Sequence, residues 1–239
     1  MKLSAPIYVL KQQARVLSRR EAIPLHQALD RIANQEGFTA WSLLSAKATP
    51  TRKRPVSTLL AQLRSGDLVL LGSRRGQGKT LLSIELAIRM MQQGSQAAFF
   101  TLDFTATEVA NCFKALDVDL GEFQDRFLVD TSDQICAEYI LSKLASAPAN
   151  MLVVIDYLQL LDQKRENPDL TSQVQQLRSF ARERQLIILC LSQIDRRYDS
   201  TNRPCPEISD VRLPNPLDLS LFDKTCFLHQ DTMQIASSA

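Results

Sequence analysis

The chain has 239 residues, of which 45% are hydrophobic, and 28 Lys/Arg against 26 Asp/Glu leave a net charge of +2. This length and apolar content suffice for one substantial α/β core with a small appendage. They exclude a membrane-spanning protein, because apolar runs such as "MLVVI" (151–155) are far shorter than the roughly 20 residues that a bilayer requires.

Two further features indicate the compartment. The N-terminus has no apolar block of signal-peptide length, so we expect a cytoplasmic protein. The five cysteines form no C-x-x-C pair and only two histidines are present, which predicts reduced thiols and argues against a zinc site.

The first 47 residues predict a basic three-helix module. One face of a helix over 4–20 is apolar, a second helix opens at Pro24 and stops near Gly37, and a third begins at Phe38, where Trp41 would close the core. Residues 48–58, "ATPTRKRPVST", are basic, contain proline and lack periodicity, which predicts a linker.

The charge is divided unevenly along the chain. Residues 1–54 carry ten Lys/Arg and three Asp/Glu, a net charge of +7, whereas residues 55–239 carry 18 and 23, a net charge of −5. Either the basic module meets an anionic partner, or its charges only keep a small helical unit soluble.

Residues 59–239 predict an α/β domain with a mainly parallel sheet flanked by helices. Continuous apolar runs alternate with helical stretches, and this alternation is typical of strands buried on both faces. The expected strands are 68–72, 97–102, 126–130, 151–156, 186–192 and 225–229, and the expected helices are 79–93, 106–116, 133–146 and 171–184.

The segment "GDLVLLGSRRGQGKT" (66–80) predicts a strand that runs into a phosphate-binding loop, although Ser73 stands where the G-x-x-x-x-G-K-[ST] pattern has its first glycine. Lys79 would reach the β- and γ-phosphates of ATP, and the Thr80 hydroxyl would hold Mg²⁺. An ordinary strand–turn–helix is the alternative. The expected nucleotide contacts are Ser73, Arg74, Arg75, Gly76, Gln77, Gly78, Lys79, Thr80 and Leu81.

Polar residues end three later strands, at the edge where ligands bind in open α/β sheets. Asp156 would hold Mg²⁺ through a water, unless it is only a capping or loop residue. Asp103 could act as a general base, or as a helix cap. Ser192 and Gln193 suit sensing of the γ-phosphate.

Arg196 and Arg197 follow the last of these strands in an expected loop. They would contact phosphate, either on nucleic acid or in a neighbouring site, or they are only solvated.

These segments together resemble the RecA-type motor domain of DnaB-family replicative helicases, over residues 64–231. The resemblance is carried, in order, by "SGDLVLLGSRRGQGKT", "FFTLDFTATEV", "LVVIDYLQLL", "LSQIDRR", "RPCPEISDVR" and "FDKTCFLHQD". It implies a RecA-like P-loop fold, ring assembly into a hexamer, Mg-ATP hydrolysis between subunits and single-stranded DNA in a central channel. It also adds Arg212 as a DNA-binding candidate, and in this family a small residue commonly replaces the first loop glycine.

The chain departs from the family pattern in three places. Asp103 replaces a catalytic glutamate, and a displacement of about 1 Å can cost about 10²-fold in rate. After Arg212 the chain reads "RLPNPLDLS", with two prolines in place of a glycine-containing run. The sequence ends eight residues after "FLHQD", so we expect the family's last hairpin, with its lysine and arginine, to be missing.

The basic module stands in place of the family's usual N-terminal domain. It has a faint helix-turn-helix pattern, but the third helix exposes few polar residues, which favours protein docking over DNA binding.

We therefore expect a DnaB-like P-loop ATPase acting on DNA with weak intrinsic hydrolysis, in which Lys79, Asp103 and Gln193 are catalytic and Arg196, Arg197 and Arg212 meet DNA. The alternatives are an ATP-gated adaptor or loader that unwinds nothing, and a scaffold that has lost hydrolysis.

Overall fold

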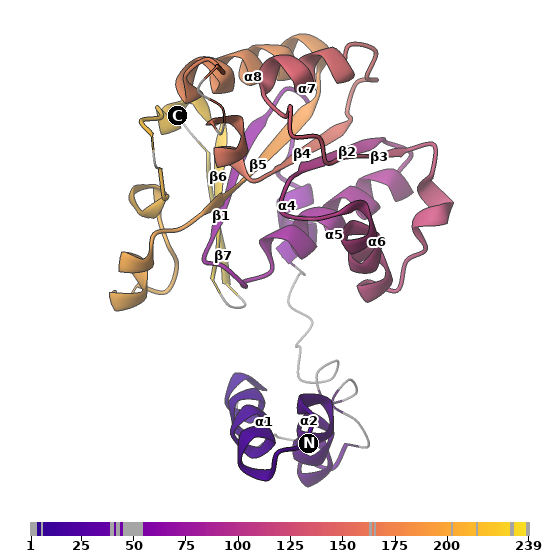
Figure 1. Cartoon of the computed structure of the whole chain (residues 1–239), viewed down its shortest axis with the longest axis vertical. Coiled ribbons are helices and arrows are strands. Elements are labelled where there is room, and N and C mark those ends of the chain that lie inside the picture. The colour runs from indigo at the N-terminus through magenta and orange to yellow at the C-terminus, as the bar shows by residue number, and fades with distance from the viewer. Residues whose placement is uncertain are drawn as a thin grey trace. The chain divides into compact units, whose positions relative to one another are not determined.

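A computed structural model describes residues 4–5, 7–38, 41, 44, 55–162, 164, 166–201, 203–213, 215–229 and 232–237. The chain divides into two compact units, Met1–Arg54 and Pro55–Ala239 (Figure 1). Each unit has its own apolar core.

The first unit contains α1 (Ile7–Glu21) and α2 (Leu25–Gln35). Both helices agree with the sequence pattern, and Phe38 and Trp41 pack against their core as expected. Apart from Leu44, the rest of the expected third helix and residues 48–54 of the expected linker lie outside the described residues. The buried core residues of this unit are Leu10, Ala14, Ala28, Ile32, Ala33 and Leu44.

The second unit begins at Pro55 and not at residue 59. Helix α4 (Pro55–Leu60) occupies the end of the segment that we expected to be a linker. Its residues Val56 and Leu59 are fully buried in the core of the second unit, and this burial gives a short segment without periodicity a helical structure.

The second unit is built on one seven-stranded sheet, in the order β3-β2-β4-β5-β1-β6-β7. The first six strands pair in parallel, which confirms the α/β prediction, and β7 pairs antiparallel to β6. The strands are β1 (Leu68–Ser73), β2 (Ala97–Thr101), β3 (Phe127–Asp130), β4 (Leu152–Asp156), β5 (Ile187–Gln193), β6 (Lys224–His229) and β7 (Thr232–Ser237).

Helices cover both faces of this sheet, and neighbouring strand residues enter opposite cores. Leu70 packs with α7 (Ala137–Lys143) and α8 (Leu170–Arg184), whereas Leu71 packs with α4, α5 (Lys79–Gln92) and α6 (Ala106–Ala115). Figure 1 shows α7 and α8 on one side of the sheet and α5 and α6 on the other. Burial on both faces explains why these strands are continuously apolar.

The structure of this unit differs from the sequence prediction in two places. The helix expected over 133–146 is only α7, because the Ser132 amide donates to Asp130 Oδ1 (2.9 Å) and the Gln134 amide to Ser132 Oγ (3.2 Å), bonds that hold the preceding chain in turns. The unit also has a strand that we did not expect, since β7 returns along β6 as a hairpin. The sequence of β7, "TMQIAS", contains no lysine or arginine.

Short 3₁₀ helices fill several connections: η1 (Leu120–Phe123), η2 (Leu158–Asp162), η3 (Arg196–Ser200), η4 (Ile208–Asp210) and η5 (Leu219–Leu221). Arg196 and Arg197 therefore lie in a 3₁₀ turn rather than in an irregular loop. None of the helices in the described ranges combines the length and apolar character needed to cross a bilayer.

Candidate nucleotide-binding site

The order of the strands gathers the predicted site residues at one edge of the sheet. Strand β5 lies between β1 and β4, so that Ser73 aligns with Gln193 and Asp156 aligns with Leu191. Strand β2 follows on the other side of β4, where Thr101 aligns with Asp156. Because all four strands are parallel, their carboxyl ends form one continuous edge.

The loop between β1 and α5 has the backbone that a phosphate site needs. Gly76 and Gly78 have positive φ angles of 78° and 85°, and Gly78 is the N-cap of α5. A Cβ atom on either glycine would meet nothing within 4 Å, so it is the backbone conformation that requires glycine here. The loop leads into the N-terminus of a 14-residue helix, whose free amides and dipole favour an anion.

Gly72, one position before the place of the first glycine in the standard pattern, is required by the packing of the sheet. A Cβ atom on Gly72 would lie 2.8 Å from Cε1 of Phe227 and 3.1 Å from Cδ1 of Ile194. Ser73, by contrast, is the last residue of β1, keeps a strand backbone and is fully buried. Its position in the strand therefore accepts a small side chain, which accounts for the departure from the standard pattern.

Thr80, the second residue of α5, meets Asp156 at the end of β4. Thr80 Oγ1 donates a hydrogen bond to Asp156 Oδ2 at 2.9 Å, and the Asp156 residue is 1% exposed. Burial raises the pKa of the Asp156 carboxyl, the positive charge of Lys79 and the bond from Thr80 oppose this shift, and the charge of Asp103 adds to it.

A hydroxyl and a carboxylate at this position suit Mg²⁺. Protein sites commonly hold this ion through one or two oxygen ligands and the phosphates of the substrate. Within the described residues, no group of three or more His, Cys, Asp or Glu side chains could hold a metal by itself. Thr80 and Asp156 thus fit a magnesium ion that arrives with a nucleotide.

Asp103 is exposed just beyond the end of β2 and is not the cap of the next helix. Thr105 is the N-cap of α6, in a reciprocal capping box with Glu108, as the sequence predicts. The Asp103 amide donates to Thr101 Oγ1 at 3.1 Å. Since capping is done by Thr105, the Asp103 carboxylate stays available at the site edge.

The side chain of Arg74 turns away from the loop toward η3. Its Nε and Nη2 donate to the two carboxylate oxygens of Asp199, at 2.8 and 2.7 Å, and its Nη1 donates to the Ile194 carbonyl at 2.9 Å. The hydrogen bond to Asp199 raises the pKa of Arg74, and the same bond lowers the pKa of Asp199. Arg74 thus ties the loop to η3, while Arg75 is exposed.

The end of β5 is connected to the segment that carries Arg212. The Arg212 amide donates to the Gln193 carbonyl at 2.8 Å, and Ile194 and Val211 form an isolated antiparallel bridge. Arg196, Arg197 and Arg212 are all exposed on these two joined segments. The predicted γ-phosphate sensor and the three predicted DNA contacts thus lie on two segments that are hydrogen-bonded to each other.

Gln159 also belongs to this region, although sequence reasoning missed it. It lies in η2, three residues after Asp156, and contacts Ser192 and Arg212. The only sequence signal is an amide within the otherwise apolar run "LQLL".

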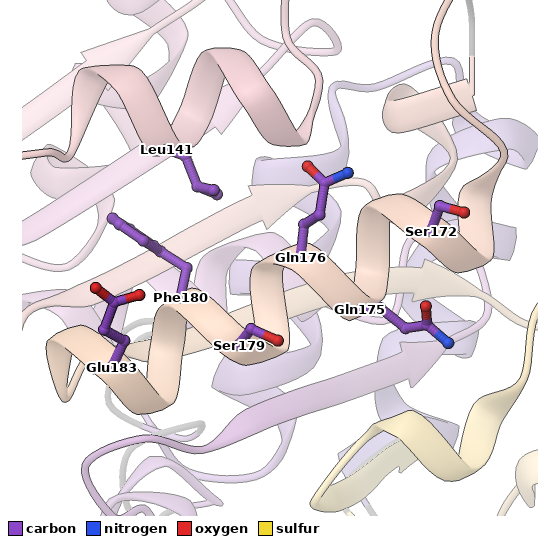
Figure 2. Close-up of a pocket in the computed structure, with 7 residues that line it drawn as sticks. All are labelled: Leu141, Ser172, Gln175, Gln176, Ser179, Phe180 and Glu183. Carbon is purple, nitrogen blue, oxygen red and sulfur yellow. The ribbon is translucent and has the colours of Figure 1, made fainter.

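A hollow of about 390 Å³ lies elsewhere, along α8. Figure 2 shows Leu141 of α7 and Phe180 of α8 on facing sides of it, with polar residues of α8 along the rest. None of its lining residues belongs to the phosphate loop or to the carboxyl ends of β2, β4 and β5. This hollow is therefore separate from the predicted nucleotide site.

Comparison with known proteins relates the second unit to a family of helicase domains. Residues 121–237 match the family described as DnaB-like helicase C terminal domain. The second unit also has the fold of solved DnaB-like ATPase domains. This confirms the resemblance that the ordered motifs carry.

The curated relatives are replicative helicases of low identity. The Helicobacter pylori (strain J99) replicative DNA helicase DnaB is 24% identical over 225 residues, which cover 78% of this chain and 46% of the relative. A probable plasmid replicative DNA helicase of Chlamydia muridarum is 26% identical over 194 residues, which cover 68% and 43%. The chain thus spans about half the length of the curated relatives it matches.

Two solved structures share the DnaB-like fold. One, described as an ATPase domain, has a TM-score of 0.60 at 21% identity, and the match covers 80% of this chain and 81% of that domain. The other, a DnaB-like replicative helicase described with its interactions with primase, has a TM-score of 0.61 at 20% identity, and the match covers 94% of this chain and 66% of the helicase chain.

Proposed function

We propose that this protein is a DnaB-like ATPase that binds Mg-ATP at the loop 74–78 and acts on single-stranded DNA. The observation that carries the proposal is the bond between Thr80 Oγ1 and the buried Asp156 carboxylate, at the start of the helix that follows a loop with two left-handed glycines. Together they supply an anion site and a cation site side by side.

Each site residue has a distinct role in this proposal. Lys79 and the loop amides bind the phosphates, and Thr80 and Asp156 hold the magnesium, which neutralises charge on the phosphates. Asp103 orients and deprotonates the attacking water. Gln193 contacts the terminal phosphate from the end of β5.

The substrate and the assembly form part of the same proposal. Arg196, Arg197 and Arg212 bind DNA phosphates, and copies of the chain form a ring, a hexamer by resemblance, in which a neighbouring subunit completes each site. Residues 1–47 form a module that docks a protein partner. Their net basic charge and the apolar groove between α1 and α2 support this role.

One observation favours the second candidate, an ATP-gated adaptor or loader. Strand β7 pairs with β6 but contributes no basic side chain toward a neighbouring site. An arginine at such a position can contribute about 10³–10⁵ to turnover. Together with the short Asp103 side chain, this predicts slow hydrolysis.

Steady-state ATP hydrolysis by the full chain, with and without single-stranded DNA, tests the proposal. Lys79→Ala supplies the blank, and Asp103→Glu tests whether the shorter acid limits the rate. Stimulation by DNA of tenfold or more supports the ATPase. ATP binding with a rate equal to the blank supports the adaptor, and hydrolysis that survives Lys79→Ala overturns the site.

A further inference from the structure

Gln159 joins the nucleotide edge of the sheet to the segment that carries Arg212. Its Nε2 donates to Ser192 Oγ at 3.2 Å and to the Arg212 carbonyl at 2.6 Å. A side-chain amide has two N–H donors, so both are used. One partner lies at the end of β5, and the other lies on the chain that we assign to DNA.

Gln159 lies in a short helix that packing holds in place. It stands in η2, which follows directly on β4 and contains the buried residues Leu158, Leu160 and Leu161. Its own Oε1 is buried and has no hydrogen-bond partner within the described part of the chain. The two hydrogen bonds from Nε2 therefore set the orientation of the side-chain amide.

Arg212 is held at both ends of its own backbone. Its amide donates to the Gln193 carbonyl at 2.8 Å, while its carbonyl accepts from Gln159. On the other side of β5, the Ile194 amide donates to the Ser73 carbonyl at 3.0 Å. A short chain of hydrogen bonds thus runs from the phosphate loop through Gln193 to Arg212.

We infer that Gln159 is a positioning residue that couples the phosphate-sensing end of β5 to Arg212, so that nucleotide binding changes the affinity for DNA. The inference rests on the proposed function. A shift of Gln193 toward a terminal phosphate pulls on the Arg212 amide, and Gln159 fixes the opposite end of that residue. Such coupling needs a contiguous element that both ligands bias, and its measure is a change in affinity.

Gln159→Glu is the decisive variant, because it keeps the shape of the side chain and removes both N–H donors. Gln175→Glu, on the exposed face of α8, is the matched control for the added negative charge. We would measure the affinity for a fluorescein-labelled oligo-dT by anisotropy, with and without a non-hydrolysable ATP analogue, and the affinity for the analogue itself.

The wild-type protein and Gln175→Glu should bind oligo-dT with affinities that differ between the two nucleotide states. In Gln159→Glu the ratio of these affinities should fall to about one, with the affinity for the analogue within about twofold of wild type, because coupling and binding are separate quantities. The double variant Gln159→Glu/Arg212→Ala should bind DNA no more weakly than Arg212→Ala alone.

A second readout separates this inference from the proposed function. In the protein without ligands, the Arg212 amide should exchange its hydrogen about tenfold faster or more in Gln159→Glu, because the segment loses a hydrogen bond. Amides of α5 should keep their wild-type rates.

Three results would overturn the inference. The first is an unchanged rate of hydrogen exchange at the Arg212 amide in Gln159→Glu, and the second is a ratio of oligo-dT affinities that still depends on nucleotide in this variant. The third is a wild-type affinity for oligo-dT that is the same with and without nucleotide. A wild-type protein that binds no DNA at all would instead overturn the proposed function. The coupling claim would then fall with it, and exchange would decide only whether Gln159 positions Arg212.

Discussion

Thr80 and Asp156, 76 positions apart in the sequence, are joined by a hydrogen bond of 2.9 Å between hydroxyl and carboxylate. The Asp156 residue is 1% exposed, and burial raises the pKa of its carboxyl above the ordinary value of 3.8. A cation bound to the Thr80 hydroxyl and to the Asp156 carboxylate offsets the cost of burying this negative charge. In its absence the ionised carboxylate destabilises the fold.

The first prediction concerns pH. Because the folded carboxyl of Asp156 keeps its proton to higher pH than the unfolded one, its contribution to stability falls as pH rises from 3.8 through the raised pKa. Asp156→Asn should remove that fall and be more stable than wild type at pH 7 without magnesium, yet lose Mg-ATP binding. Urea unfolding in chelator from pH 4 to 8 measures this. Asp125→Asn, which removes an exposed carboxylate, is the control, and an unaltered pH slope in Asp156→Asn would refute the prediction.

The second prediction separates Gly72 from Ser73. Gly72→Ala should lower the free energy of unfolding by about 1–3 kcal/mol, because a Cβ atom 2.8 Å from the buried Phe227 ring overpacks the core. Ser73→Gly should cost only about 0.5–1 kcal/mol, the backbone entropy of a glycine within a strand. Denaturant unfolding gives both values. Phe227→Leu should recover part of the loss caused by Gly72→Ala, and equal stability of Gly72→Ala and wild type would contradict the packing argument.

The third prediction concerns Arg74. Asp199→Asn should weaken ATP binding by no more than about fivefold, the range of exposed ion pairs, because Arg74 then holds the loop less firmly. The effect should shrink in high salt and vanish in an Arg74→Ala background. Titration with a fluorescent ATP analogue measures it. If Asp199→Asn instead binds ATP more tightly, Asp199 competes with phosphate for Arg74 and does not brace the loop.

The fourth prediction concerns the opposite edge of the sheet. Lys224 Nζ lies 2.5 Å from Asp67 Oδ2, and each side chain is 11% exposed. Lys224→Met should lower the free energy of unfolding by about 3 kcal/mol, because it leaves a buried carboxylate without its counter-charge. Asp67→Asn/Lys224→Met should cost less than this single change, and Lys114→Met on α6 should cost almost nothing. ATP affinity should be unchanged throughout, and altered affinity would contradict the separation of the two edges.

Much of the second unit could be predicted because its signals are local. Continuous apolar strands ended by Asp156 and Gln193, with helices between them, define a parallel sheet and the edge where it binds ligands. The capping box at Thr105 was equally readable. The structure places these residues as the sequence order implies.

The missed features depend on contacts between distant segments. The role of Gly72 is set by Phe227, and the direction of Arg74 is set by Asp199, more than a hundred residues away in each case. Strand β7 has no apolar run, because it is an edge strand whose residues are mostly exposed, so its pairing comes from β6 alone. Gln159 gave no signal, since its partners are revealed only by the fold.

The alternation of the strand residues between two separate cores has a consequence for how this unit can change over generations. The helix that carries Lys79 and Thr80 packs in one core, and α7 and α8 pack in the other, and among the described residues no buried side chain is common to both. Substitutions can accumulate and compensate one another beneath α7 and α8 while the layer that holds the phosphate loop is left as it was. The sheet therefore separates the two cores, so that the surface over α7 and α8 can change in evolution without disturbing the phosphate loop.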